Sequence, residues 1–161
     1  MSLLRPDRYF NSVTDIRPEE LHALGIRGLI LDVDNTLTTH GNPEISPEIQ
    51  AWLYRMKAQR FQLAVVSNNA RSRVEPFGRR IGVAYFWRAR KPFACGYKRA
   101  QKLFGLRPEQ IAVVGDQVFT DIAGAKGCGM HAFIVRPLEP ESGPFFRFKR
   151  RLERPILREF Q

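Results

Sequence analysis

The chain has 161 residues, of which 43% are hydrophobic, and it carries a formal net charge of +10 at pH 7. This length and composition predict one folded domain and exclude a disordered chain. No apolar run approaches the roughly 20 residues that a membrane-spanning helix needs, and the N-terminal segment lacks the apolar region of a secretion signal. The charge favours an anionic partner: nucleic acid, an acidic membrane surface or a phosphorylated substrate.

The first predicted strand, residues 28–33, carries Asp32 near its end, and a second carboxylate, Asp34, directly follows it. Residues two apart in an extended chain point to the same face. Such a pair can hold a cation, perform acid–base and nucleophilic chemistry, or simply form a turn or helix cap. An EF-hand calcium loop is excluded, because its glycine and glutamate positions would hold Leu37 and Pro43.

A strongly marked helix follows the first strand. Ser46 is the expected N-cap and Pro47 the first helical residue, and apolar residues then recur with helical spacing. Further strands are predicted at residues 61–67, 83–87, 111–116 and 131–135, and further helices at 71–80, 93–104 and 119–126. This alternation predicts an α/β protein with a five-stranded, parallel, doubly wound sheet of Rossmann-like type.

Ligands of such sheets bind outside the carboxyl ends of the strands. In chain order, the polar residues expected there are Asp32, Asp34 and Thr36, then Ser67 and Asn68, then Lys91, and finally Asp116 and Asp121. Asp32, Asp34 and Asp116 in one crevice would repel one another unless a cation neutralises them. Because all the candidate ligands are hard oxygens, Mg²⁺ is favoured over zinc.

The remaining residues of this set suit a phosphorylated substrate. Ser67 and Lys91 can donate hydrogen bonds to phosphoryl oxygens, and we include Thr36 and Asn68 as candidate phosphate-binding residues. One aspartate can attack phosphorus to form an aspartyl-phosphate, while its neighbour serves as general acid and then base.

The stretch "DVDNT" (residues 32–36), the strand-end Ser67, Lys91 and "GDQVFTD" (residues 115–121) resemble the four ordered motifs of the haloacid dehalogenase-like (HAD) superfamily of phosphatases. Over nearly the whole chain, the sequence is similar to YqeG-type phosphatases of HAD subfamily IIIA. That group includes phosphatidylglycerophosphate phosphatases, which release phosphate from a lipid precursor to give phosphatidylglycerol.

The resemblance implies a role for each motif residue. Asp32 would be the nucleophile and a Mg²⁺ ligand, and Asp34 the general acid/base whose backbone carbonyl also binds the metal. Ser67 would bind the phosphoryl group and Lys91 would stabilise the phosphorylated aspartate. The remaining residues are metal-site residues: Asp116 as the further acidic ligand, and Asp121 in support through water or Lys91.

The loops at the predicted site are short. The segment between Asp34 and Ser46 is a brief loop, and the segment between Ser67 and Lys91 has room for one helix and one strand. Neither can hold a separate cap domain, so we expect an open site. An open site suits a phosphate carried on a bulky body, such as a membrane lipid, a protein or a nucleic acid end.

The predicted domain, residues 1–143, is followed by a basic amphipathic segment, residues 144–161. Its arginines at 147, 150, 151, 154 and 158 and its apolar residues at 145, 148, 152, 156 and 160 form two stripes. We favour association with an anionic membrane surface. Docking of the apolar stripe on the domain and RNA binding are the alternatives, and Pro155 is expected to break or kink the helix.

These observations predict a Mg²⁺-dependent phosphatase that is cytoplasmic, bound peripherally to the membrane, and acts on phosphatidylglycerophosphate. One alternative keeps the enzyme but changes its substrate to a nucleic acid end or a phosphoprotein. A second alternative is a non-catalytic, basic HAD-like module that binds RNA or ribosomes. The intact set of Asp32, Asp34, Lys91 and Asp116 argues against it, because a binding module does not need that geometry.

Overall fold

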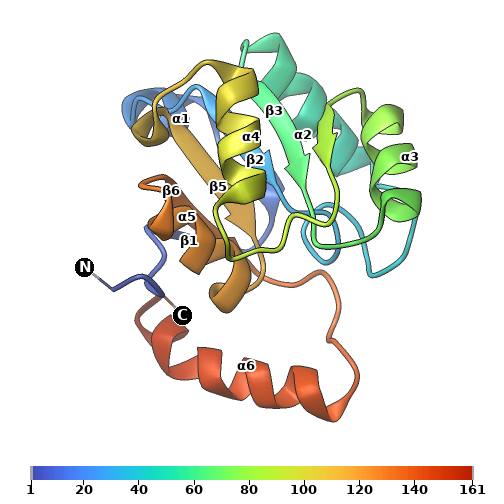
Figure 1. Cartoon of the computed structure of the whole chain (residues 1–161), viewed down its shortest axis with the longest axis vertical. Helices are drawn as coiled ribbons and strands as arrows, with labels where there is room; N and C mark the ends of the chain where they lie inside the picture. The colour runs from blue at the N-terminus through green and yellow to red at the C-terminus, as the bar shows by residue number, and fades with distance from the viewer. Residues whose placement is uncertain (1, 161) are drawn as a thin grey trace.

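The computed structural model describes residues 2–160 and contains a parallel β-sheet covered on both faces (Figure 1). Every pair of neighbouring strands is parallel. Across the sheet the strands are β1 (Arg8–Phe10), β6 (His131–Val135), β5 (Ile111–Gly115), β2 (Gly28–Leu31), β3 (Gln62–Val66) and β4 (Ala84–Phe86). The predicted α/β architecture is confirmed, with one strand more than expected.

The expectation of five strands was wrong because the edge strand β1 was missed. β1 has only three residues, "RYF", and none of them is fully buried, so it lacks the apolar run that marks the inner strands. It pairs with β6 in the register Tyr9↔Ile134. Just before it, the Asp7 carboxylate accepts a hydrogen bond from the backbone N–H of Ala132 at 2.8 Å, which ties the strand to the sheet.

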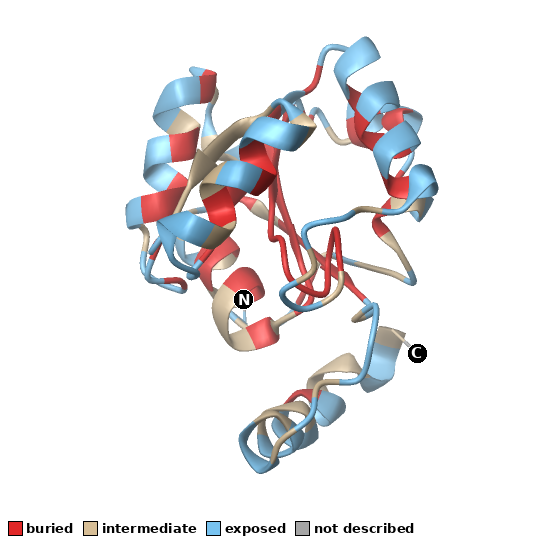
Figure 2. Cartoon of the chain, turned by 90° about the vertical axis from the view of Figure 1, so that its right-hand side faces the viewer, coloured by how far each residue is buried: buried red, intermediate tan, exposed pale blue. Residues whose placement is uncertain are grey.

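Helices lie on both faces, as a doubly wound sheet requires. The core on one face includes residues of α1 (Pro18–Ala23), α2 (Pro47–Ala58) and α3 (Arg71–Ile81), and the core on the other includes residues of α4 (Cys95–Phe104) and α5 (Ala123–Gly127). Within β2, Leu29 and Leu31 point into the first core and Ile30 into the second. Figure 2 shows the buried strands at the centre, with exposed helix surfaces outside. Short helical turns complete the chain at Val13–Asp15 (η1), Pro108–Gln110 (η2), Val118–Ile122 (η3, a π-helical turn) and Arg158–Phe160 (η4).

Helix α2 begins where its sequence predicts. The Ser46 hydroxyl accepts a hydrogen bond from the backbone N–H of Ile49 at 3.3 Å, and Pro47 is the first helical residue. The helix buries Trp52 completely, and the indole Nε1–H donates to the backbone carbonyl of Ile16 at 2.9 Å. This bond joins α2 to the segment that leads from β1 into α1.

The last helix, α6 (Pro144–Leu157), lies beyond the carboxyl ends of the strands (Figure 1). The expectation that Pro155 breaks the helix was wrong: the helix continues two residues further, to Leu157, and a short helical turn follows at Arg158–Phe160. Ile156 and Leu157 pack against the core. A cavity of about 760 Å³, lined in part by Tyr9 and Leu157, separates much of α6 from the sheet.

Two expected features hold for residues 2–160. The segment between β2 and α2 is a loop, so no cap domain is inserted there. None of the helices in this range combines the length and the apolar character that crossing a bilayer would demand.

The buried indole of Trp52 yields a test of the fold. Trp52→Phe should lower the free energy of unfolding by about 1–3 kcal/mol, because it leaves the buried Ile16 carbonyl without its donor. Denaturant unfolding measures this. Tyr54→Phe is the control on the same helix, since Tyr54 is 76% exposed; an equal effect of both changes would contradict the assigned role of the indole.

Candidate active site

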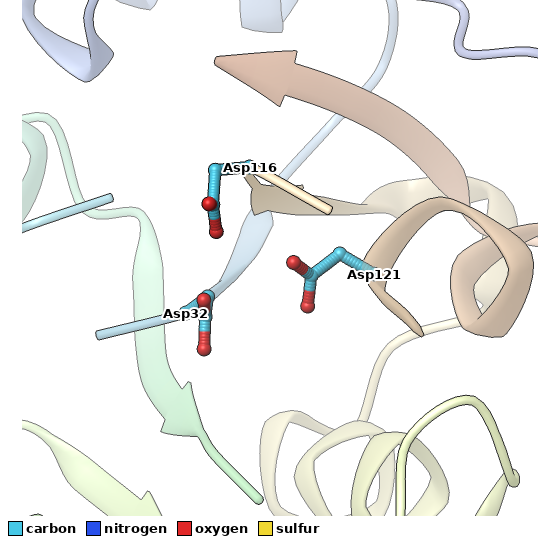
Figure 3. Close-up of side chains that lie close together, drawn as sticks. All are labelled: Asp32, Asp116 and Asp121. Atoms are coloured by element: carbon cyan, nitrogen blue, oxygen red, sulfur yellow. The ribbon is translucent and has the colours of Figure 1, made fainter. Parts of the chain in front are cut away.

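Three carboxylates meet at the carboxyl ends of the central strands (Figure 3). Asp32 follows β2, Asp116 follows the adjacent β5, and Asp121 lies in η3 just beyond. One oxygen from each lies within 4.8 Å of the other two. The convergence follows from topology, because β2 and β5 are paired in parallel and therefore end together.

The Lys91 ammonium lies between two of these acids. Its Nζ is 2.8 Å from Asp32 Oδ1 and 2.7 Å from Asp121 Oδ1, and the residue is only 8% exposed. The Asn68 side-chain amide bonds both backbone groups of Lys91. Its Oδ1 accepts a hydrogen bond from the Lys91 N–H at 2.6 Å, and its Nδ2 donates one to the Lys91 C=O at 3.3 Å. The structure thus places Asn68, a candidate phosphate-binding residue, against the loop that carries Lys91.

Asp121 reaches the cluster because Gly115 has no side chain. A Cβ at Gly115 would lie 2.2 Å from Asp121 Oδ2, much closer than atoms can approach. The π-helical turn η3 brings Asp121 back toward the strand, where Asp121 Oδ2 accepts a hydrogen bond from the backbone N–H of Gln117 at 3.2 Å. Glycine at 115 and the wide turn together make the third carboxylate part of the site.

The cluster shifts the pKa values of its members. Burial raises the pKa of Asp32 to about 6, and the positive charge of Lys91 only partly opposes this. Burial also raises the pKa of Asp116 well above its usual range, with the neighbouring charges of Asp32 and Asp121 adding to the effect. Burial opposes the charge of Lys91, but the attraction of Asp121 and Asp32 prevails and raises its pKa. Burial is therefore the main cause that disfavours the ionised carboxylates, and their mutual repulsion adds to it.

The residues present fit a divalent cation. Asp116 Oδ1 is buried and has no hydrogen-bond partner among residues 2–160, although buried polar atoms normally have one. A cation near Asp32, Asp116 and Asp121 could bind Asp116 Oδ1 as one of its ligands. Its positive charge would also reduce the repulsion among the three carboxylates. An all-oxygen set suits hard cations rather than zinc.

Asp34 is held apart from this cluster by its own partners. Its carboxylate accepts hydrogen bonds from the backbone N–H of Gly41 at 2.8 Å, from Arg73 at 2.9 Å and from the Asn69 amide. Asn35, with φ of 60°, forms the tight turn that follows Asp34. From the sequence, Asn69 is expected only as a polar residue after β3, without a role of its own, and Arg73 is not predicted at all; its position shortly after β3, the neighbour of β2, is the signal that could have identified it.

The two hydroxyl candidates are both buried. Ser67 is 2% exposed, and its hydroxyl accepts a hydrogen bond from the backbone N–H of Asn69 at 3.1 Å. Thr36 is 1% exposed, and its hydroxyl has no hydrogen-bond partner in the described part of the chain. Ser67 follows β3 and Thr36 follows β2, so both lie at the same edge of the sheet as the acids.

Arg150 of α6 also reaches the cluster, which its sequence pattern did not predict. Its Nη2 lies 2.6 Å from Asp116 Oδ2. The sequence placed Arg150 in an outward basic stripe with its neighbour Arg151, but the structure turns it toward the sheet. The stripe that remains exposed comprises Arg147, Arg151, Arg154 and Arg158.

A profile of the family described as "Mitochondrial PGP phosphatase" matches residues 1–139. The chain belongs to the PGP phosphatase family. It is 35% identical over 152 residues to the "Probable phosphatase YqeG" of Bacillus subtilis, with 94% of this chain and 88% of that protein covered. It is 31% identical to phosphatidylglycerophosphate phosphatase 1, chloroplastic/mitochondrial, of Arabidopsis thaliana, covering 99% of this chain but only 51%, about half, of that relative.

The fold agrees with this membership of the PGP phosphatase family. A solved structure from Legionella pneumophila, described as a HAD superfamily (subfamily III A) hydrolase, superposes with a TM-score of 0.54 and 21% identity, covering 86% of each chain. The resemblance to YqeG-type phosphatases is confirmed, and the fold is that of the HAD subfamily IIIA structure. The chain is therefore a member of a phosphatase family with the HAD-like fold that its motifs predicted.

The raised pKa of Asp32 predicts how stability depends on pH in the metal-free protein. Between about pH 4 and pH 6, folded Asp32 retains a proton that the unfolded chain has released, so stability falls as pH rises through this window. Asp32→Asn removes this titration. In EDTA, the free energy of unfolding of the variant relative to wild type should therefore increase by about 1–3 kcal/mol from pH 4 to pH 8.

Urea unfolding at a series of pH values measures this difference. Asp15→Asn, which removes an exposed carboxylate, is the control for the loss of a negative charge. If the stability curves of Asp32→Asn and wild type run parallel over the whole range, burial of the Asp32 carboxylate has no energetic cost and the prediction is wrong.

Proposed function

We propose that this protein is a Mg²⁺-dependent phosphomonoesterase that converts phosphatidylglycerophosphate to phosphatidylglycerol through an aspartyl-phosphate. The observation that carries the proposal is the buried cluster of Asp32, Asp116, Asp121 and Lys91 in a member of the PGP phosphatase family. Support for the lipid substrate comes from the Arabidopsis thaliana relative, named as a phosphatidylglycerophosphate phosphatase.

The first step transfers the phosphoryl group to Asp32. Near neutral pH the Asp32 carboxylate is mostly ionised, since its pKa lies at about 6, and one of its oxygens attacks phosphorus. The bond from phosphorus to the ester oxygen breaks, and Asp34 gives a proton to the departing alkoxide. Gly41, Asn69 and Arg73 orient the Asp34 carboxylate for that transfer.

The second step returns the enzyme to its starting state. Asp34, now ionised, removes a proton from water, and the resulting hydroxide oxygen bonds to phosphorus. The bond from Asp32 to phosphorus breaks and inorganic phosphate leaves. Through both steps Lys91 stabilises negative charge beside Asp32, and Ser67 donates to a phosphoryl oxygen. A bound Mg²⁺ would supply charge neutralisation at the phosphoryl oxygens.

The surface of α6 supports a lipid substrate. Phe145, Phe148 and Leu152 are 69%, 61% and 47% exposed, and they form one stripe beside the exposed arginines. A helix with adjacent apolar and basic stripes suits the interface of an anionic bilayer, where each basic side chain contributes about 1 kcal/mol. We propose accordingly that the protein acts at the membrane surface as a peripheral protein.

A substrate comparison tests this function. Phosphate release from phosphatidylglycerophosphate in mixed micelles should exceed release from phosphorylated oligonucleotides and phosphopeptides by at least about a hundredfold in kcat/KM, because the lipid alone also engages α6. Asp32→Asn should abolish turnover while the fold is retained, since it removes the nucleophile and keeps the shape. Turnover of oligonucleotides alone would overturn the lipid assignment, and retained turnover by Asp32→Asn would overturn the mechanism.

A second prediction concerns the outward face of α6. The double variant Phe148→Ser, Leu152→Ser should weaken binding to vesicles containing anionic lipid by at least about tenfold, because two apolar side chains no longer enter the interface. Hydrolysis of a water-soluble phosphomonoester should fall much less. Vesicle co-sedimentation measures binding, with Leu103→Ser on α4 as control, since Leu103 is 58% exposed. Equal losses in both variants would argue against a membrane role for α6.

A further inference from the structure

Arg150 contacts both the side chain and the backbone of Asp116. Its Nη2 is 2.6 Å from Asp116 Oδ2, and its Nη1 is 2.6 Å from the Asp116 backbone carbonyl. A guanidinium group presents its N–H donors in a rigid planar fork, so two such bonds to one residue restrict that residue's orientation. The Asp116 side chain is fully buried, and Arg150 is the one cationic side chain within ion-pair distance of it in residues 2–160.

Arg150 is in turn held by acids. Glu153, one turn further along α6 and 1% exposed, lies 2.8 Å from Arg150 Nη1, and Glu141 lies 3.2 Å from Arg150 Nη2. The other Glu153 oxygen accepts a hydrogen bond from the backbone N–H of Val118 at 2.9 Å. Because Val118 begins η3, α6 is bonded to Asp116 and also to the turn that carries Asp121.

The two oxygens of Asp116 have different surroundings. Oδ2 accepts from Arg150, whereas Oδ1 is buried without a hydrogen-bond partner in the described chain. We propose that Arg150 is a positioning residue: it holds Asp116 so that Oδ1 is available to the divalent cation, and this makes α6 a part of the metal site. The inference rests on the proposed metal-dependent function and adds a residue that none of the HAD-like motifs contains.

A simple charge effect would act in the opposite direction. If Arg150 did no more than add positive charge beside the site, removing it would strengthen binding of a cation. If it orients Asp116, removing it weakens binding, since partners of metal ligands typically contribute about tenfold to a hundredfold to metal affinity. The sign of the change in Mg²⁺ affinity therefore distinguishes the two effects.

The experiment is a Mg²⁺ titration of the unfolding temperature, with the 161-residue chain first freed of metal by EDTA. Arg150→Gln should raise the Mg²⁺ concentration that gives half-maximal stabilisation by about tenfold to a hundredfold. Arg150→Lys keeps the charge but not the fork and should give an intermediate shift. The matched control is Arg151→Gln, because Arg151 is exposed and forms no ion pair in residues 2–160; it should behave as wild type.

Two further points make the result decisive. If Arg150→Gln fails to fold, because it leaves the buried Glu153 without a counter-charge, Arg150→Lys and Glu153→Gln carry the test. Glu153→Gln still offers Val118 an acceptor, and it should weaken Mg²⁺ binding a few-fold. Wild-type Mg²⁺ affinity, or a tighter one, in the folded Arg150 variants would overturn the proposal. No Mg²⁺ response of the wild-type chain would instead contradict the metal-dependent function, and with it this inference.

Discussion

The site depends on the buried ammonium of Lys91, which lies between Asp32 and Asp121. A buried charge is tolerated only when it is paired and hydrogen-bonded. Here the Lys91 ammonium pairs with the carboxylates of Asp32 and Asp121. Without Lys91, Asp32 and Asp121 would face each other beside Asp116, with all three carboxylates buried. The surrounding structure serves this pairing: Asn68 holds the loop of Lys91, and Gly115 leaves space for Asp121.

Much of the fold could be predicted because its causes are local. The Ser46–Pro47 start of α2 and the apolar inner strands are encoded in a few adjacent residues. The meeting of Asp32, Lys91 and Asp116 followed from one global rule, that parallel strands end at the same edge of a sheet. Where local pattern and topology agree in this way, sequence determines structure strongly.

The features that escaped prediction depend on tertiary docking. β1 is a strand because β6 offers it an edge. Tyr9 and Phe10 favour a strand, but a segment of three residues is too short to predict one from its sequence. Arg150 and Arg151 both belong to the row of arginines that recurs with helical spacing in this segment. The sequence does not say which of the two faces the sheet, because that depends on how α6 is placed against the domain. The profile of the PGP phosphatase family likewise ends at residue 139, before α6 begins at Pro144, so the family motifs carry no information about this contact.

The cavity of about 760 Å³ beneath α6 has a consequence for how the helix is held. Apart from Ile156 and Leu157 near its end, α6 is attached through charged and polar groups such as Arg150 and Glu153, whereas the sheet is held by apolar packing. Salt shortens the range of charge interactions from about 8 Å at physiological ionic strength to about 3 Å at 1 M, and it leaves apolar burial intact. The ion pairs of Arg150 with Asp116 and Glu153 measure 2.6 Å and 2.8 Å and their acidic partners are buried, so salt screens them far less than it screens exposed pairs. The attachment of α6 therefore tolerates ionic strength, and a loss of one of these buried charges disturbs it much more.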